Sequence, residues 1–319
     1  MAIRMVLTRL GWALVTILLS AVLVFVAIQS LPGDAATQIL GQNATPEAVA
    51  TLRAQLGLDQ EPVQRFLSWL GNAVTGDFGT SLASGQPVGT EVGQALLNTS
   101  FLAAVTILVG FVLACVLGLV AGVYRDRWPD SVISTLALIG MSVPEFIVAT
   151  LLVLLLAITF PVFPAVVTAG SNATVPELLP SMPLPALALV MVSAAYIIRM
   201  MRTSVIDVME TEFVRTARLK GVAPARLILR HVVPSAILPT LNVIAMNVAW
   251  LIGGVVVVES IFNYPGLGTL MIRSVQNRDL PVILLIAVLS AVTYVVCNLL
   301  ADLAAIMLNP RLRYPRRVR

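Results

Sequence analysis

The sequence holds few lysine, histidine and cysteine side chains, and their placement excludes several common catalytic sites. Its 319 residues include one lysine, Lys220, and one histidine, His231. A P-loop needs a glycine directly before its lysine, but Leu219 occupies that place, so no Walker A sequence is present. A zinc site needs several ligands, and no cysteine or carboxylate cluster accompanies His231, which we expect to pack or cap at the base of a helix. We therefore expect no catalytic residue and no metal-binding residue, and an intramembrane enzyme is the least favoured class.

A second group of polar side chains lies inside long apolar runs, where ionisable groups are costly and are candidates for function by default. One interpretation is that they line a polar pathway for a solute, and the other is that they hydrogen-bond between helices. For Glu145 the pathway is favoured, because a charge needs water nearby. The candidate pathway residues are Glu145, Asn242, Asn247, Asn298 and Asp302.

The mouth segment, residues 259–268, follows the fifth apolar run and combines a proline with two glycines, which indicates a fixed turn. Its aromatic side chains could close the outer mouth of the pathway or contact a soluble partner. A passive anchor at the membrane interface is an equally good interpretation for Tyr264. The candidate mouth residues are Glu259, Phe262, Tyr264, Pro265, Gly266 and Gly268.

The elbow, residues 203–234, separates the fourth and fifth apolar runs and carries acidic residues early and basic residues late. That order fits the dipole of a helix over about 204–220, with an apolar stripe from Val205 to Phe213 and Ala217. Gly221 is a plausible C-cap, Pro224 suits the first turn of a second short helix, and Pro234 interrupts the chain before the fifth run. The elbow is either a membrane-surface loop or a docking element for a cytoplasmic partner.

Composition places these residues in a membrane protein, because 58% of the chain is hydrophobic and only 11% is charged. A soluble domain carries about 25% charged residues. The apolar runs are continuous rather than alternating, so they predict helices and not barrel strands. We therefore expect an all-α membrane protein with six transmembrane helices, at about residues 10–31, 99–123, 131–160, 185–201, 235–258 and 282–307.

The distribution of basic residues predicts the orientation of these helices. With the N-terminus in the cytoplasm, sixteen of the 20 basic residues fall on the cytoplasmic side. The basic excess then needs no nucleic acid to explain it. The outer loop, residues 32–98, lies on the other side, where Pro46 and the apolar spacing from Val63 to Leu70 predict two short helices before a turn-rich stretch marked by Gly76, Gly79 and Gly85.

The elbow resembles the signature of the integral-membrane permeases of bacterial ATP-binding-cassette importers, which is Glu-Ala-Ala, three residues, Gly, nine residues and Ile-x-Leu-Pro. Ala217, Gly221 and Pro234 agree with it, whereas Arg215 and Thr216 replace Glu and Ala, and His231 replaces Ile. These departures resemble the B-type permeases of dipeptide and oligopeptide importers. Further segments resemble the same branch: 31–34 (LPGD), 56–59 (LGLD), 76–79 (GDFG), 215–221 (RTARLKG), 259–268 (ESIFNYPGLG), 278–281 (RDLP) and 309–311 (NPR, for the family's Asp-Pro-Arg).

The resemblance implies a type I ABC importer permease architecture. It implies an N-terminus and first span over 1–31, an extracytoplasmic loop subdomain over 32–98, a core permease domain over 99–309 and a basic cytoplasmic tail over 310–319. A cytoplasmic coupling helix at about 204–230 would transmit force from the ATPase. The residues implied in coupling are Arg215, Thr216, Ala217, Arg218, Gly221, Pro224, Arg226 and Pro234.

The resemblance also implies partners in a bacterial plasma membrane, with both termini cytoplasmic. A second homologous permease would complete the pathway, two ABC ATPase subunits would use ATP and magnesium, and an extracytoplasmic binding protein would deliver the peptide. This chain itself would hold no cofactor. Related permeases serve nickel, glutathione or haem, so these substrates stay open. An autonomous secondary transporter would use Glu145 as an ion site, but it leaves the elbow and the mouth segment unexplained.

Overall fold

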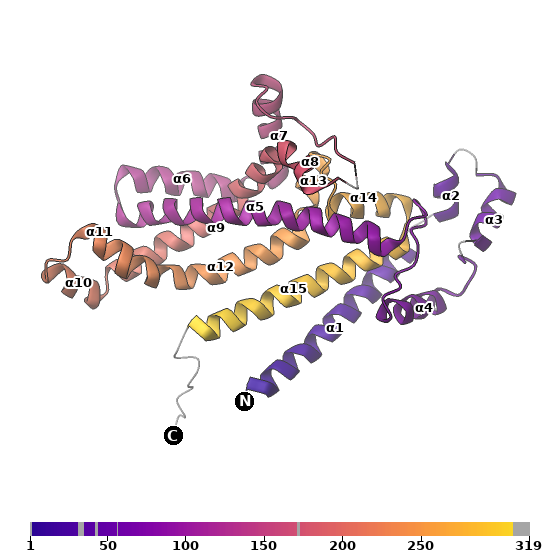
Figure 1. Ribbon diagram of the computed structural model, residues 1–319, viewed down its shortest axis with the longest axis horizontal. Coiled ribbons are helices and arrows are strands. Elements are labelled where there is room, and N and C mark those ends of the chain that lie inside the picture. The colour runs from indigo at the N-terminus through magenta and orange to yellow at the C-terminus, as the bar shows by residue number, and fades with distance from the viewer. Residues whose placement is uncertain (1, 31–34, 42–43, 56, 171–172, 309–319) are drawn as a thin grey trace.

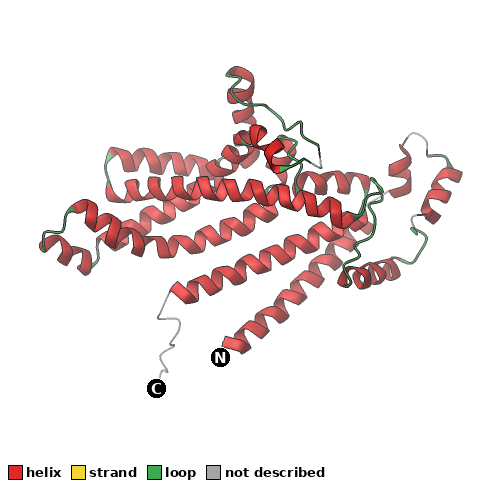
Figure 2. Ribbon diagram, in the orientation of Figure 1, coloured by secondary structure: helices red, strands yellow, loops and turns green. Residues whose placement is uncertain are grey.

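The chain folds into a bundle of helices, as the computed structural model shows (Figures 1 and 2). The structure describes residues 2–30, 35–41, 44–55, 57–170 and 173–308, and the regular elements in these ranges are all helical. The long helices are α1 (Ala2–Gln29), α5 (Val88–Val123), α6 (Trp128–Ser142), α9 (Pro183–Met209), α12 (Val233–Gly254) and α15 (Leu280–Leu308). The shorter ones are α2 (Ala35–Leu40), α3 (Pro46–Gln55), α4 (Pro62–Val74), α7 (Glu145–Val153), α8 (Val175–Leu178), α10 (Glu212–Leu219), α11 (Pro224–Leu227), α13 (Val256–Ile261) and α14 (Leu267–Asn277).

The expected membrane spans correspond to the long helices, although the number six is not established. Within the described residues, four helices are long and apolar enough to cross a membrane by themselves, namely those in α1, α5, α9 and α15, and a bent pair would make a fifth. The fifth expected span falls on α12, a helix of 22 residues that contains Pro239. Apolar length therefore confirms an all-α membrane protein.

The third expected span, over 131–160, is not one continuous helix. The chain forms α6, breaks at Val143 and Pro144, and continues as α7 and a π-helical turn over Leu154–Thr159, at 105° to α6. The cause is local, because proline lacks a backbone N–H and forces the preceding residue out of the helical region. Val143 accordingly has extended dihedrals, φ −88° and ψ 124°. Figure 1 shows α7 leaving the direction of α5 and α6.

Helices α5 and α9 form the centre of the bundle and share its most extensive helix–helix contact. Helices α6, α7 and α12 also pack against α9, while α15 packs against α12 and α1. Figure 1 shows α10 and α11 at one end of this bundle, and α14 with the outer-loop helices α2 to α4 toward the other. We call these the elbow end and the mouth end.

Small residues at every fourth position of α5 allow this close contact. Gly110, Ala114, Gly118 and Gly122 are buried on one face of the helix. A Cβ on Gly118 would lie 2.7 Å from Cβ of Met201 and 2.8 Å from the Ile198 carbonyl oxygen, and one on Gly122 would lie 2.7 Å from Cβ of Val205. Small residues of this kind let membrane helices approach backbone to backbone.

The outer loop contains the two helices that the sequence predicts there, α3 beginning at Pro46 and α4 beginning at Pro62. Helix α4 lies against α1 through aromatic rings, since the Phe66 ring of α4 is 5.0 Å from the Phe25 ring of α1, centroid to centroid. Within α4, the Phe66 ring also stacks on that of Trp69 at 6.4 Å. Gly76, Gly79 and Gly85 have left-handed dihedrals, which confirms the predicted turns.

A buried carboxylate fastens the end of the outer loop to the core. Asp279, between α14 and α15, is almost completely buried and accepts hydrogen bonds from the Ser81 hydroxyl, from the Leu82 N–H at 3.1 Å and from the Ala83 N–H at 3.3 Å. Asp279 belongs to the motif at 278–281, and its donors follow shortly after the motif at 76–79. The contact therefore brings together two motifs that lie far apart in the sequence.

The α5–α9 contact predicts that Gly118→Ala destabilises the protein. The new methyl group would overlap Met201 and the backbone of α9, and overpacking of this kind costs about 1–3 kcal/mol. Gly93→Ala is the matched control in the same helix, because a Cβ there meets nothing within 4 Å. Thermal unfolding of the purified protein in detergent should show a lower midpoint for Gly118→Ala and an equal or higher midpoint for Gly93→Ala. Equal midpoints for Gly118→Ala and the unmodified protein would contradict the prediction.

Candidate functional site

Beyond the end of α9, the elbow forms two short helices, α10 and α11, in place of the single long helix that the sequence predicts over 204–220. Helix α9 extends to Met209, and α10 begins anew after Thr211, whose backbone is extended. The hydroxyl of Thr211 donates a 2.6 Å hydrogen bond to the Val208 carbonyl, which satisfies an acceptor at the end of α9. The interruption turns the chain and changes which face of α10 is buried.

The end of α10 is closed by the cap that the sequence predicts at Gly221. This glycine has φ +74°, its N–H donates to the Arg218 carbonyl at 3.0 Å, and the Val222 N–H donates to the Ala217 carbonyl at 3.2 Å. Together these two bonds form a Schellman motif, which requires a left-handed residue. Pro224 then occupies the first turn of α11, also as predicted.

An apolar cluster fixes the elbow to the ends of the long helices. Val214 of α10 and Leu227 of α11 are buried with Met201 and Val205 of α9 and with Ala236 of α12. Phe213, which the sequence analysis placed on the apolar stripe, is instead 47% exposed. That assignment is wrong because the break at Thr211 shifts the helical phase by the time the chain reaches α10.

The opposite face of the elbow is exposed and basic. Arg215, Arg218 and Arg226 are exposed there, and Leu219 is 83% exposed beside them. Thr216, Gly221, Pro224 and Pro234 are also exposed, and Ala217 is half-buried. The structure thus brings the predicted coupling residues to one end of the bundle. Their elements are apolar where they pack on the long helices and polar where they are exposed.

The mouth segment is built around the side chain of Glu259, which is completely buried in α13. Its carboxylate accepts hydrogen bonds from the Thr99 hydroxyl at 2.6 Å and from the Gly268 N–H at 2.7 Å. Thr99 in turn accepts from the Leu267 N–H at 2.8 Å. The carboxylate therefore binds the first turn of α14, where helix N–H groups have no partners within the helix and the dipole favours a negative charge.

The two glycines of the mouth segment are required by this carboxylate. A Cβ on Gly266 would lie 2.1 Å from Oε1 of Glu259, and a Cβ on Gly268 would lie 2.4 Å from Cα of Val256. Neither position has room for a side chain, so these glycines serve close packing and not flexibility.

The aromatic residues of the mouth segment are buried as well. The hydroxyl of Tyr264 donates a 2.9 Å hydrogen bond to the Asn98 carbonyl, and the Phe262 carbonyl accepts from the Val167 N–H at 2.8 Å. Tyr264 is therefore not an anchor at the membrane interface. The predicted contact with a soluble partner is also corrected: Glu259, Phe262, Tyr264, Gly266 and Gly268 are all buried in this conformation, and Pro265 is half-buried.

The candidate pathway residues whose side chains are described lie on three different helices, α7, α12 and α15. Glu145 is half-buried in the first turn of α7, next to the break after α6. The amide of Asn247 donates 2.8 Å to the Val243 carbonyl of its own helix, and Asn298 is half-buried on α15. The side chains of Asn242 and Asp302 lie outside the described part of the structure. Pathway lining stays a prediction for all five.

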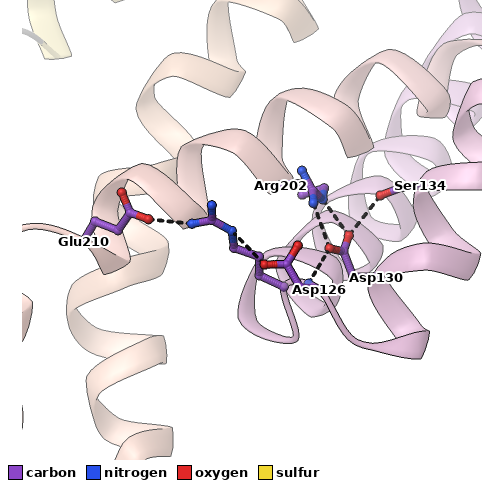
Figure 3. Close-up of polar contacts among 6 residues, drawn as sticks. Asp126, Asp130, Ser134, Arg202 and Glu210 are labelled. Atoms are coloured by element: carbon purple, nitrogen blue, oxygen red, sulfur yellow. Dashed lines mark hydrogen bonds and ion pairs between the residues drawn. The ribbon is translucent and has the colours of Figure 1, made fainter.

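One charged pair was not predicted from the sequence, where its arginine was counted only among the sixteen basic residues of the cytoplasmic side. Asp130 of α6 is paired with Arg202 of α9, as Figure 3 shows. The sequence did contain one indication of such a pair, because an arginine inside the last turns of an apolar helix needs a partner. Its partner lies 72 residues earlier, and sequence spacing does not reveal such a pair.

The geometry of the mouth predicts different effects for two substitutions of Glu259. Glu259→Ala leaves the Thr99, Gly268 and Thr269 donors without their acceptor, at about 1–3 kcal/mol for each buried group left unsatisfied. Glu259→Gln keeps an acceptor of the same size. Thermal unfolding in detergent should show a large fall in midpoint for alanine and a smaller fall for glutamine, and equal falls would contradict this assignment of the carboxylate.

Comparison with known proteins places these features in a family. Residues 114–314, more than half of the chain, match the model of the binding-protein-dependent transport system inner membrane component, and residues 2–108 match the N-terminal model of the same systems. The glutathione transport system permease protein GsiC of Salmonella choleraesuis is 36% identical over 309 residues, and that of Escherichia coli (strain K12) is 35% identical over 309 residues. Both alignments cover 97% of this chain and 98% of the relative. The chain therefore belongs to the binding-protein-dependent transport system inner membrane components, as an ABC importer permease of the peptide-type branch.

Proposed function

We propose that this chain is the transmembrane permease subunit of an ATP-driven importer of peptides, and that it forms half of the translocation pathway. A second homologous permease supplies the other half. The observation that carries the proposal is the match to the permease family along nearly the whole chain. The curated relatives are named for glutathione transport, and glutathione, itself a small peptide, is the first alternative substrate.

The elbow is the element through which two separate ATPase subunits drive this permease. Its exposed face offers Arg215, Arg218 and Arg226, and its buried face is joined to α9 and α12 through Val214 and Leu227. The ATPase subunits bind and hydrolyse ATP with magnesium. Movement of the elbow then rocks the helices that it joins, as a rigid-body transition.

This function fixes the orientation of the chain in the bacterial plasma membrane. The elbow and both termini face the cytoplasm, in agreement with the excess of basic residues on that side. The mouth segment and the outer loop face the opposite side, where an extracytoplasmic binding protein delivers the peptide. The buried mouth segment holds the shape of this surface, on which Asn263 is exposed.

A substitution of Gly221 tests the elbow. Gly221→Leu forces a branched side chain into a left-handed conformation, which costs about 1–2 kcal/mol and shifts the turn between α10 and α11. Gly221→Asn is the matched control, because asparagine tolerates this conformation. In proteoliposomes with the partner subunits, we expect Gly221→Leu to lose ATP-dependent uptake and the ATPase subunits to copurify more weakly. Normal uptake and normal copurification with Gly221→Leu would contradict the coupling role.

The energy source and the substrate are tested together in the same vesicles. Peptide uptake should require ATP inside the compartment that the elbow faces, together with the binding protein and both ATPase subunits, and a proton gradient alone should not support it. Labelled dipeptide, oligopeptide and glutathione supplied in parallel distinguish the peptide proposal from the glutathione alternative. Uptake by this chain alone, driven by an ion gradient, would establish a secondary transporter instead.

A further inference from the structure

The carboxylate of Asp130, at the elbow end, accepts four hydrogen bonds. Asp130 lies in the first turn of α6 and is 3% exposed. Arg202 of α9 donates to it twice, from Nε at 2.5 Å and from Nη2 at 2.7 Å. The Ser134 hydroxyl donates at 2.9 Å and the Asp126 N–H at 3.0 Å. Two parallel bonds between a guanidinium and a carboxylate fix orientation as well as distance.

The turn between α5 and α6 is shaped for this contact. Asp126 has φ +62°, a left-handed conformation that aspartate adopts more readily than most residues. In that conformation its N–H points at the carboxylate of Asp130 (Figure 3). The pair therefore joins three elements at once: the turn after α5, the first turn of α6 and the last part of α9.

Arg202 also lies directly before the elbow. Met209, the end of α9, is seven positions further along the chain, roughly 10 Å along the helix axis. On its other side, α9 meets the backbone of α5, since a Cβ on Gly122 would lie 3.0 Å from the Arg202 carbonyl oxygen. The same stretch of α9 is thus held by α5 through close packing and by α6 through the ion pair.

A second ion pair joins neighbouring elements but has a different environment. Arg125, at the end of α5, contacts Glu210 at the end of α9 with 2.5 Å between Nη1 and Oε1. These side chains are 48% and 66% exposed, whereas those of Arg202 and Asp130 are 29% and 4% exposed, so that the carboxylate is the buried partner. Exposed pairs contribute little because water and salt screen them, while loss of one partner from a buried pair leaves an uncompensated charge.

We propose that Asp130 and Arg202 are positioning residues for energy coupling, which clamp α6 to α9 so that the α5–α6 turn moves with the elbow as one unit. The clamp passes displacement of the elbow to α6, and through α6 to the bent helix α7 that carries Glu145. Without the clamp, α9 and the elbow move while α6 lags behind. This proposal rests on the proposed function, because it assumes that force enters at the elbow.

The test compares substrate transported with ATP hydrolysed in proteoliposomes that contain the complete importer. Arg202→Gln and Asp130→Asn should raise the ATP consumed per substrate imported about tenfold, within the 5–150-fold range usual for coupling between distant sites. The ATPase subunits should still copurify, because the exposed face of the elbow is unchanged. Arg202→Lys should be intermediate, since lysine keeps the charge but loses the two-pronged geometry.

Two further variants separate coupling from stability. Arg125→Gln removes the exposed pair on the same turn and should leave the ratio of ATP to substrate unchanged. The reversed pair, Asp130→Arg with Arg202→Asp, should restore the ratio toward that of the unmodified protein more than either single change does. Thermal midpoints in detergent show whether each variant is folded.

The outcomes distinguish this proposal from the proposed function on which it rests. An unchanged ratio in folded Arg202→Gln and Asp130→Asn overturns the clamp and leaves the elbow assignment intact. A folded reversed pair that restores nothing also overturns it, because the two charges then do not act through each other. Normal copurification and uptake with Gly221→Leu would instead overturn docking at the elbow.

Discussion

The close approach of α5 and α9 is the constraint on which the rest of the bundle depends. Lipid provides no hydrophobic force that drives apolar helices together, so their association depends on close packing. Gly118 and Gly122 supply it by bringing the backbone of α5 against Met201 and Val205. Helices α6, α7 and α12 all pack on α9, so the position of α9 relative to α5 determines where the elbow and the mouth stand.

Three buried carboxylates then fix the ends of the bundle. Among the described residues, Asp130, Glu259 and Asp279 are the acidic side chains that are almost completely buried. A buried charge is tolerated only where hydrogen bonds replace water, and each of these receives donors from a distant part of the chain. Asp130 joins helices at the elbow end, whereas Glu259 and Asp279 hold the mouth segment and the outer loop at the other end.

The features predicted correctly from sequence are those that depend on local chemistry. Apolar length located the long helices, and the cap at Gly221 and the start of α11 at Pro224 followed from turn preferences. The break at Pro144 also obeys a local rule, but the long apolar run concealed it. The burial of Glu259 was beyond prediction, because its acceptor role depends on Thr99, which is 160 residues away. Contacts across such separations leave no periodic signal in one sequence.

The proposed coupling role of the elbow requires that α10 is not stable by itself. A helix of eight residues such as α10 is too short to persist in water without tertiary contacts. It exists because Val214 is buried in one cluster with Met201 and Val205, the residues of α9 that α5 approaches most closely. Displacement of α10 therefore either disrupts the helix or displaces α9. Packed interfaces change between discrete arrangements rather than deform continuously. Helix α10 and the part of α9 on which it packs therefore move together.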